Sequence, residues 1–243
     1  MFDNITKAEI ASRWAGLPGV TLPDNLNDAI AVYEALQWAD TRPATFDITA
    51  VTPENAEAKL REFAAELAIA GDGRPGSVST IRQAQQVAKD SAARIVVQQS
   101  LVAVPAIIEQ LTPEFDREAK AYVEAVNQLP EPVTAEVLVS GGAEAVGLYG
   151  EAQQAATHLN RISAWFGEVA MVSGVLEKNM EIVLRVVRPE NVAQLVHLDA
   201  ARHLRTDPVF EALDPVLYTA ARQGVPFAIN TPREAAELRQ QFS

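Results

Sequence analysis

The histidines and a few carboxylates are the side chains of this sequence best suited to acid–base or metal chemistry. His197, Asp199 and His203 fall in one segment expected to be helical, and Asp199 and His203 are four residues apart, on one helix face. Such a pair could form an ion pair, a hydrogen-bonded base or half of a metal site. A metal needs further ligands, and His197 points to a different face. We interpret Asp199 and His203 as a surface pair and expect no metal site.

The stretch VLVSGGAEAVGLYG, residues 137–150, contains the glycines that a phosphate-binding turn would need. Gly142 and Gly147 have the spacing of a phosphate loop, but leucine and tyrosine follow them where lysine and serine or threonine are required. The adjacent Gly141 and Gly142 do not fit the dinucleotide-binding pattern. Glu144 would add a negative charge where an anion would otherwise bind. We interpret the glycines as a structural turn before a long helix and expect no cofactor.

The other reactive residue types have structural explanations. Cysteine is absent, which excludes disulfides, thiolate ligands and cysteine nucleophiles, and no serine has the Gly-x-Ser-x-Gly frame. Glu114, Asp116 and Glu118 fall in the first turn of an expected helix, where they would compensate the helix dipole. His158 lies beside a long apolar seam and is expected to pack at its edge. No catalytic residue is predicted, although the sequence leaves an enzyme open.

Helices must position these residues, and three helix starts are indicated. Thr52–Glu54, Thr112–Glu114 and Thr231–Glu234 each place a capping hydroxyl before a proline, with an acid in the first turn. The third also has the spacing of a capping box. We expect two shorter helices near the N-terminus, over residues 6–15 and 26–38.

Apolar side chains recur at helical spacing in the middle of the chain. A long helical segment over residues 79–111 is expected to kink at Pro105. It carries apolar residues seven positions apart, at Ile81, Ala88, Ile95 and Val102. The preceding segment has alternating spacings of four and three, at Ala56, Leu60, Phe63, Leu67 and Ala70. Each segment is therefore predicted to be an amphipathic helix.

The longest seam predicts a helix over residues 143–175. Its members alternate three and four positions apart, at Ala145, Leu148, Ala152, Ala155, Leu159, Ile162, Phe166, Val169 and Ser173. Small and apolar residues flank the seam, so the apolar face is too wide for a two-stranded coiled coil and favours a multi-helix bundle. We expect Leu159, Ile162, Trp165 and Phe166 to make the interactions through which this helix docks its partners.

The pattern changes after Gly174. Residues 180–187 have the β-branched enrichment of a strand, with helix as the alternative, and residues 225–230 could form a second strand. With the helices between and after them, they predict a small α+β lobe. The expected fold is mainly α, a multi-helix bundle with long antiparallel helices and this lobe. The expected domains are a helical arm or cap over residues 1–50, the bundle over 51–178 and the lobe over 179–243.

Composition limits the functional class. A net charge of −12 argues against a nucleic-acid partner. Because no long uninterrupted apolar run or leader pattern is present, we expect a cytoplasmic protein without a membrane span. The alanine- and arginine-rich, cysteine-free, acidic composition resembles that of structural modules of actinobacterial phages or prophages.

Sparse chemistry and long apolar seams together favour a non-enzymatic structural or assembly protein. We expect it to form homo-oligomers or dock protein partners through helical surfaces. The alternative is a small-molecule-binding or catalytic domain, with a pocket between the bundle and the C-terminal lobe near residues 139–142 and the pair Asp199 and His203. A weaker third reading is an adaptor that binds a protein client.

Overall fold

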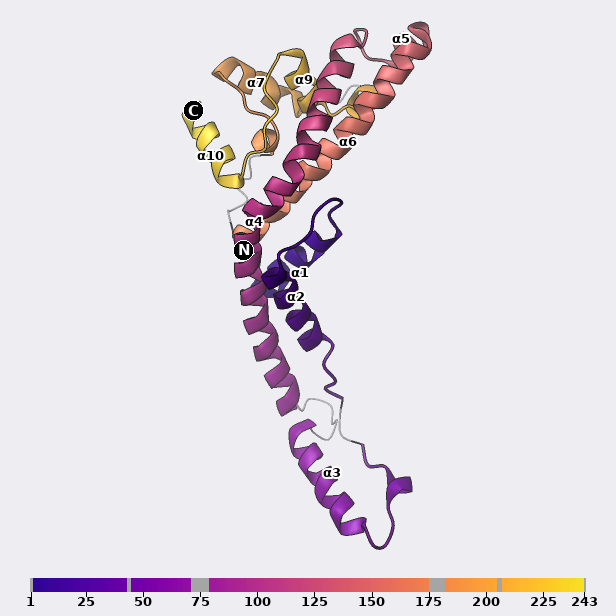
Figure 1. Cartoon of the computed structure of the whole chain (residues 1–243), viewed down its shortest axis with the longest axis vertical. Helices are drawn as coiled ribbons and strands as arrows, with labels where there is room; N and C mark the ends of the chain where they lie inside the picture. The colour runs from indigo at the N-terminus through magenta and orange to yellow at the C-terminus, as the bar shows by residue number, and fades with distance from the viewer. Residues whose placement is uncertain (1, 43–44, 71–78, 175–181, 205–206, 243) are drawn as a thin grey trace. The chain divides into compact units, whose positions relative to one another are not determined.

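The computed structural model describes residues 2–42, 45–70, 79–174, 182–204 and 207–242 (Figure 1). Within them the chain forms ten α-helices and no strand, which confirms the mainly helical class. The chain divides into two compact units: unit 1 is Met1–Phe2, Arg13–Leu22 and Leu101–Ser243, and unit 2 is Asp3–Ser12 and Pro23–Ser100. The three-part domain division stays a prediction from the sequence.

The longest helix, α4 (Thr80–Gln128), contains both Pro105 and Pro113. The predicted helix start at Thr112 is therefore wrong. The hydroxyl of Thr112 donates to the carbonyl oxygen of Ile108 at 2.8 Å instead of capping a new helix. An internal proline costs a helix about 3 kcal/mol. Leu111 and Phe115, on either side of Pro113, are buried, and burial of two such side chains offsets that cost.

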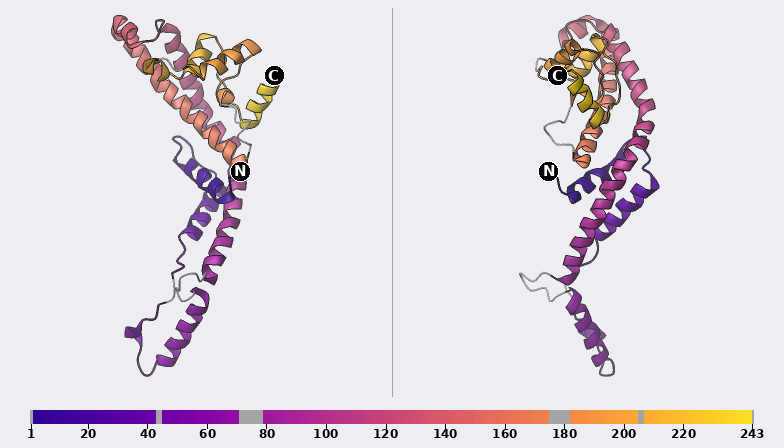
Figure 2. Two further views of the ribbon diagram at one scale, coloured as in Figure 1. Left: turned by 180° about the vertical axis from the view of Figure 1, so that it is seen from behind. Right: turned by 90° about the vertical axis from the view of Figure 1, so that its left-hand side faces the viewer.

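Two helices follow α4 in unit 1: the short α5 (Ala135–Ser140) and the long α6 (Gly142–Ser173). Thr134 caps α5 by accepting a hydrogen bond from the amide of Val137. Gly142, with a φ of 74°, lies at the turn between α5 and α6, as expected of a glycine in the left-handed region. α6 confirms the long helix predicted over residues 143–175, and it runs antiparallel beside the C-terminal part of α4 (Figures 1 and 2).

The core of unit 1 is built on the apolar face of α6. Seven members of the predicted seam are buried: Ala145, Ala152, Ala155, Leu159, Ile162, Phe166 and Val169. Buried neighbours widen this face, namely Ala156, Trp165, Ala170 and Val172. A face of this width suits contact with several neighbouring segments, as the absence of flanking charges predicted.

Short helices make up the C-terminal region of unit 1: α7 (Val192–Ala201), α8 (Pro208–Glu211), α9 (Pro215–Arg222) and α10 (Pro232–Gln241). The predicted capping box at Thr231 is present and starts α10. Two tyrosine hydroxyls connect this region to the long helices through hydrogen bonds. Tyr122 of α4 donates to the carbonyl oxygen of Leu213, and Tyr149 of α6 donates to that of Val209.

The predicted α+β lobe is wrong for the described residues, because its two expected strands do not form. Val183–Arg185 is a 3-10 turn, η4, and residues 180–181 lie outside the described residues. One isolated antiparallel bridge pairs Val187 with Phe227. Pro226 has no amide proton to donate, and Val186, on the other side of the bridge, has a non-extended backbone with φ −130° and ψ 4°. The backbone pairing therefore does not extend from this bridge into a β-ladder on either side.

A buried side chain holds these two segments together where a sheet was expected. Asn230 is 1% exposed, and its amide nitrogen lies 2.7 Å from the carbonyl oxygen of Leu184 and 3.1 Å from that of Val187. Its own backbone amide donates to the carbonyl oxygen of Arg185 at 3.0 Å. A buried amide that satisfies several carbonyls substitutes for missing strand hydrogen bonds.

Unit 2 contains α1 (Asn4–Ser12), α2 (Asp24–Gln37), η2 (Ile48–Ala50), α3 (Ala56–Ala70) and the N-terminal part of α4. Buried side chains of α2, including Leu26 and Tyr33, and of α4, including Val96, form its core. Gln85 of α4 donates to the carbonyl oxygen of Leu36 at 2.8 Å. The ring of Tyr33 lies under the ammonium of Lys89, 5.7 Å from the ring centroid.

In the part of the chain that the structure describes, α4 is the one helix long and apolar enough to cross a membrane. This judgement rests on length and composition, and 39% of its most apolar window is buried in the structure. Core helices of soluble proteins meet the same criterion, so the property does not separate the two classes.

The buried position of Leu159 generates the first prediction. Leu159→Asp should lower the free energy of unfolding of unit 1 by at least about 3 kcal/mol, because it removes core packing and buries a carboxylate. Unfolding can be followed by tryptophan fluorescence in a Trp38→Phe background, where the remaining Trp14 and Trp165 both belong to unit 1.

Two further variants complete this test. Leu159→Ala, which adds no charge, should still cost about 2–5 kcal/mol if the aspartate variant does not fold. Asn160→Asp places the same charge at an exposed neighbouring position and should have little effect. A Leu159→Asp variant as stable as the parent would contradict the placement of α6 in the core.

Candidate functional site

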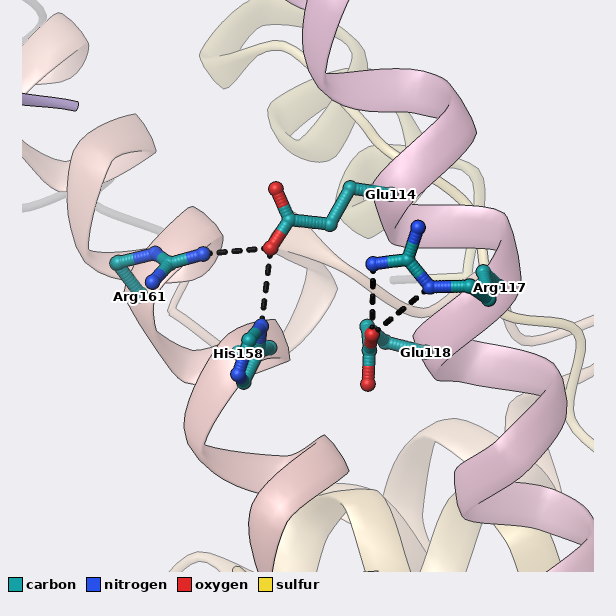
Figure 3. Close-up of polar contacts among 5 residues, drawn as sticks. All are labelled: Glu114, Arg117, Glu118, His158 and Arg161. Atoms are coloured by element: carbon teal, nitrogen blue, oxygen red, sulfur yellow. Dashed lines mark hydrogen bonds and ion pairs between the residues drawn. The ribbon is translucent and has the colours of Figure 1, made fainter. Parts of the chain in front are cut away.

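The most concentrated group of charged side chains in unit 1 joins α4 to α6 (Figure 3). Glu114 of α4 points toward His158 and Arg161 of α6. Its Oε1 atom accepts from Nδ1 of His158 at 2.9 Å and from the guanidinium of Arg161 at 2.6 Å. An ionised carboxylate can only accept, so Nδ1 of His158 carries the proton in this contact. On the neighbouring turn of α4, Arg117 pairs with Glu118 at 2.9 Å.

The surroundings of Glu114 favour its charged form. The hydrogen bond from His158 lowers the pKa of Glu114 below its ordinary 4.5, and the positive charge of Arg161 lowers it further. Burial of the carboxylate, whose side chain is 19% exposed, opposes these effects. Glu114 therefore stabilises the folded chain at neutral pH by linking two long helices.

In many nucleophilic sites a carboxylate orients the histidine that activates the nucleophile. A nucleophile would have to complete it. Among the described residues, no serine or threonine hydroxyl forms a hydrogen bond with His158, and no group of three or more histidine, aspartate or glutamate side chains could hold a metal ion. What the described contacts of Glu114 do is connect α4 to α6.

The predicted role of Glu114, Asp116 and Glu118 in compensating a helix dipole is wrong. All three residues lie in the interior of α4, where no helix terminus is present. Glu114 and His158 are 44 residues apart in sequence, and the two helices bring them together. The sequence predicted that Glu114 and His158 each lie on a helix. No local pattern indicated that the two side chains would meet.

The contacts on α6 continue toward its C-terminal end. The indole N–H of Trp14 donates to Glu168 at 3.0 Å, and Arg13 lies 3.7 Å from the same carboxylate. The Trp14 ring meets that of Trp165 edge to face at 5.6 Å. The segment Arg13–Leu22 therefore belongs to the same packed region of unit 1 as α6.

The four side chains predicted to make interactions are all inside unit 1. Leu159, Ile162, Trp165 and Phe166 are each at most 2% exposed. The indole N–H of Trp165 has no acceptor among the described residues. Within the chain these residues form its core, and an interface with another chain through them stays a prediction from the sequence.

The predicted surface pair of Asp199 with His203 does not form. Asp199 of α7 instead accepts two hydrogen bonds from Arg239 of α10, at 2.5 and 2.8 Å, and so ties two C-terminal helices together. His203 is exposed just beyond α7, and His197 contacts Gln223. The bidentate geometry of an arginine with a carboxylate explains why Arg239 is the better partner.

An open pocket of about 600 Å³ lies in unit 1 between the segment after α4 and the C-terminal helices. The rings of Phe210 and Tyr218 line it and meet edge to face at 4.9 Å. Glu131 and Asp207 also line it. Its volume falls within the range of small-molecule sites.

Unit 2 carries two mainly apolar helix stripes that its own chain does not bury. None of the fifteen residues of α3 is buried, including the predicted stripe, which we call the α3 stripe: Ala56, Leu60, Phe63, Leu67 and Ala70. A second stripe on the N-terminal part of α4 is exposed at every position; this α4 stripe is Ala84, Val87, Ser91 and Ile95, and Ser91 is its one polar member, with its hydroxyl donating to the carbonyl oxygen of Val87. Leu60 is 60% exposed and Val87 is 68% exposed. Contiguous exposed apolar side chains of this kind are typical of interaction surfaces.

Comparisons of the chain with protein-family models, curated proteins and solved structures find no match.

The charged contacts of Glu114 generate the second prediction. Glu114→Gln should lower the free energy of unfolding of unit 1 by about 1–3 kcal/mol at pH 7, because it removes hydrogen bonds to a charged group. A carboxylate whose pKa is lowered by folding stabilises the protein above its unfolded pKa, and this stabilisation is lost as the pH falls through the folded value. The difference between parent and variant should therefore shrink as the pH falls below about 4.5.

Denaturant titrations at a series of pH values measure this difference, with the same tryptophan fluorescence. Glu124→Gln is the matched control, because Glu124 lies on the same helix, is 62% exposed and is 3.9 Å from Lys120. It should change stability by less than about 0.5 kcal/mol at any pH. A Glu114→Gln deficit that stays constant down to pH 3 would rule out the ionised carboxylate as its cause.

Proposed function

We propose that this chain is a non-enzymatic assembly protein that associates with further copies of itself through helical surfaces of unit 2. The observation that carries the proposal is the α3 stripe, an amphipathic helix face without a buried residue. An isolated helix of about 15 residues is marginal in water, and most helices gain their stability by burying an apolar face. A helix such as α3 therefore has a physical reason to find a partner.

Further features fit the same role. The described charged clusters link helices to one another, as Glu114 does with Arg161 and Asp199 does with Arg239. The net charge of −12 disfavours nucleic acid as the partner. We place this assembly in the cytoplasm, and the compositional resemblance to phage or prophage structural modules is in keeping with it.

A second candidate, a small-molecule-binding domain, is favoured by the open pocket beside Phe210 and Tyr218. It lies between the segment after α4 and the C-terminal helices, and its lining includes neither residues 139–142 nor Asp199 and His203, where that alternative expected a pocket. A compact monomer that a ligand stabilises against heating, with the stabilisation lost in Phe210→Ala, would favour this candidate over assembly.

The uncovered α3 stripe generates the third prediction. Leu60→Glu should weaken self-association at least about tenfold, because burying an unpaired charge at an interface costs more than about 1.4 kcal/mol. The measurement is mass by size-exclusion chromatography with light scattering over a range of protein concentrations. Circular dichroism should show an unchanged helix content, because Leu60 is exposed in the single chain.

Ala65→Glu is the control for this experiment. Ala65 is exposed on the opposite side of α3 from the stripe, so the same charge there should leave the mass unchanged. A parent chain that is monomeric at every concentration would refute the proposal, and so would equal effects of the two glutamates.

A further inference from the structure

We propose that the α3 stripe of one copy packs against the α4 stripe of a second copy, so that two chains form a reciprocal dimer through unit 2. This inference rests on the proposed function and names its partner surface. In such an arrangement each chain contributes one α3 and one α4, and the two contacts are related by twofold symmetry. Isologous contacts of this kind double the buried area without requiring a new surface.

The two stripes have similar helical spacing, and both are mainly apolar. The residues of the α3 stripe are separated by four and three positions, and those of the α4 stripe by three, four and four. Both spacings produce a narrow face along a helix, which suits ridges-into-grooves packing of two helices. At 1.5 Å per residue, the α3 stripe extends about 21 Å and the α4 stripe about 17 Å, so either can cover most of the other.

The charges beside the stripes are complementary. Residues 45–70, which include α3, contain five acidic and two basic side chains, whereas residues 80–100 of α4 contain three basic and one acidic. Some of these charges pair inside their own segment: Lys59 with Glu62, Arg61 with Glu57, and Arg94 with Asp90. The charges left over are acidic in the first segment, whereas in the second they are the basic Arg82 and Lys89, of which Lys89 already lies over the ring of Tyr33. Opposite excess charge favours contact between the α3 and α4 segments over contact between two α3 segments.

Each chain leaves both of its own stripes unburied: the α4 stripe is exposed, and the α3 stripe is exposed at Ala56 and Leu60 and partly exposed at its other three positions. The side chains of Leu60, Val87 and Ile95 are all more than half exposed in the single chain. Phe63 is partly covered by Phe46, with ring centroids 5.0 Å apart, but no residue of α3 is buried. A second copy presents the complementary face to each stripe at once.

Cross-linking of single-cysteine variants tests this arrangement, and the absence of cysteine from the natural chain makes the test clean. Leu60→Cys on an untagged chain is mixed with Val87→Cys on a chain with a larger tag, and the mixture is treated with a short bis-maleimide. The mixed product is identified by its intermediate size. The control replaces Leu60→Cys by Ala65→Cys, on the opposite side of α3. Light scattering on the same samples records whether oligomers are present.

The expected result is a mixed product several-fold more abundant with Leu60→Cys than with Ala65→Cys. Oligomers by light scattering with equal yields from the two cysteines would overturn this inference and leave the assembly function standing. Efficient cross-linking only within a single chain that carries both Leu60→Cys and Val87→Cys would show that α3 packs on its own α4, and would also overturn it. Monomers throughout would refute both the inference and the proposed function.

Discussion

Burial of the apolar face of α6 is the constraint on which unit 1 depends. Leu159, Ile162 and Phe166 lie at its centre and are almost completely inaccessible to solvent. Polar contacts are arranged around this face: Glu114 reaches it from α4, and Trp14 reaches it from the N-terminal segment. These contacts fix the orientation of neighbours that hydrophobic packing alone would leave free to slide, because hydrogen bonds are directional and apolar contact is not.

Much of the helical architecture could be predicted, because it depends on local sequence patterns such as apolar spacing and helix caps. The spacing of the seam identified α6, and the capping box at Thr231 identified α10. The predictions failed where tertiary packing overrides a local signal. Thr112 and Pro113 have the composition of a helix start, yet burial of Phe115 and its neighbours carries α4 through them. Residues 182–187 are rich in β-branched side chains, but the described segment that pairs with Val187 contains Pro226, which has no amide proton to donate.

The candidate sites also divide into those with a local sequence pattern and those that only the fold brings together. Absence of a phosphate loop or a nucleophile motif could be recognised from sequence, because those motifs are contiguous. The pairing of Glu114 with His158, and of Asp199 with Arg239, could not be predicted, because each joins two helices that only the fold brings together. Apolar stripes were visible in both units. Which of them the chain buries itself could be read only from the structure: it buries most of the seam of α6 and buries no residue of α3.

The isolated bridge between Val187 and Phe227 has a consequence for how this chain can aggregate. An exposed strand edge is a template onto which another extended segment can add, and this is a common route to amyloid-like association. In the described C-terminal residues the extended segments are closed by the side chain of Asn230 and interrupted by Pro226, so they present no such edge. Association by strand addition therefore has no starting point in these described segments.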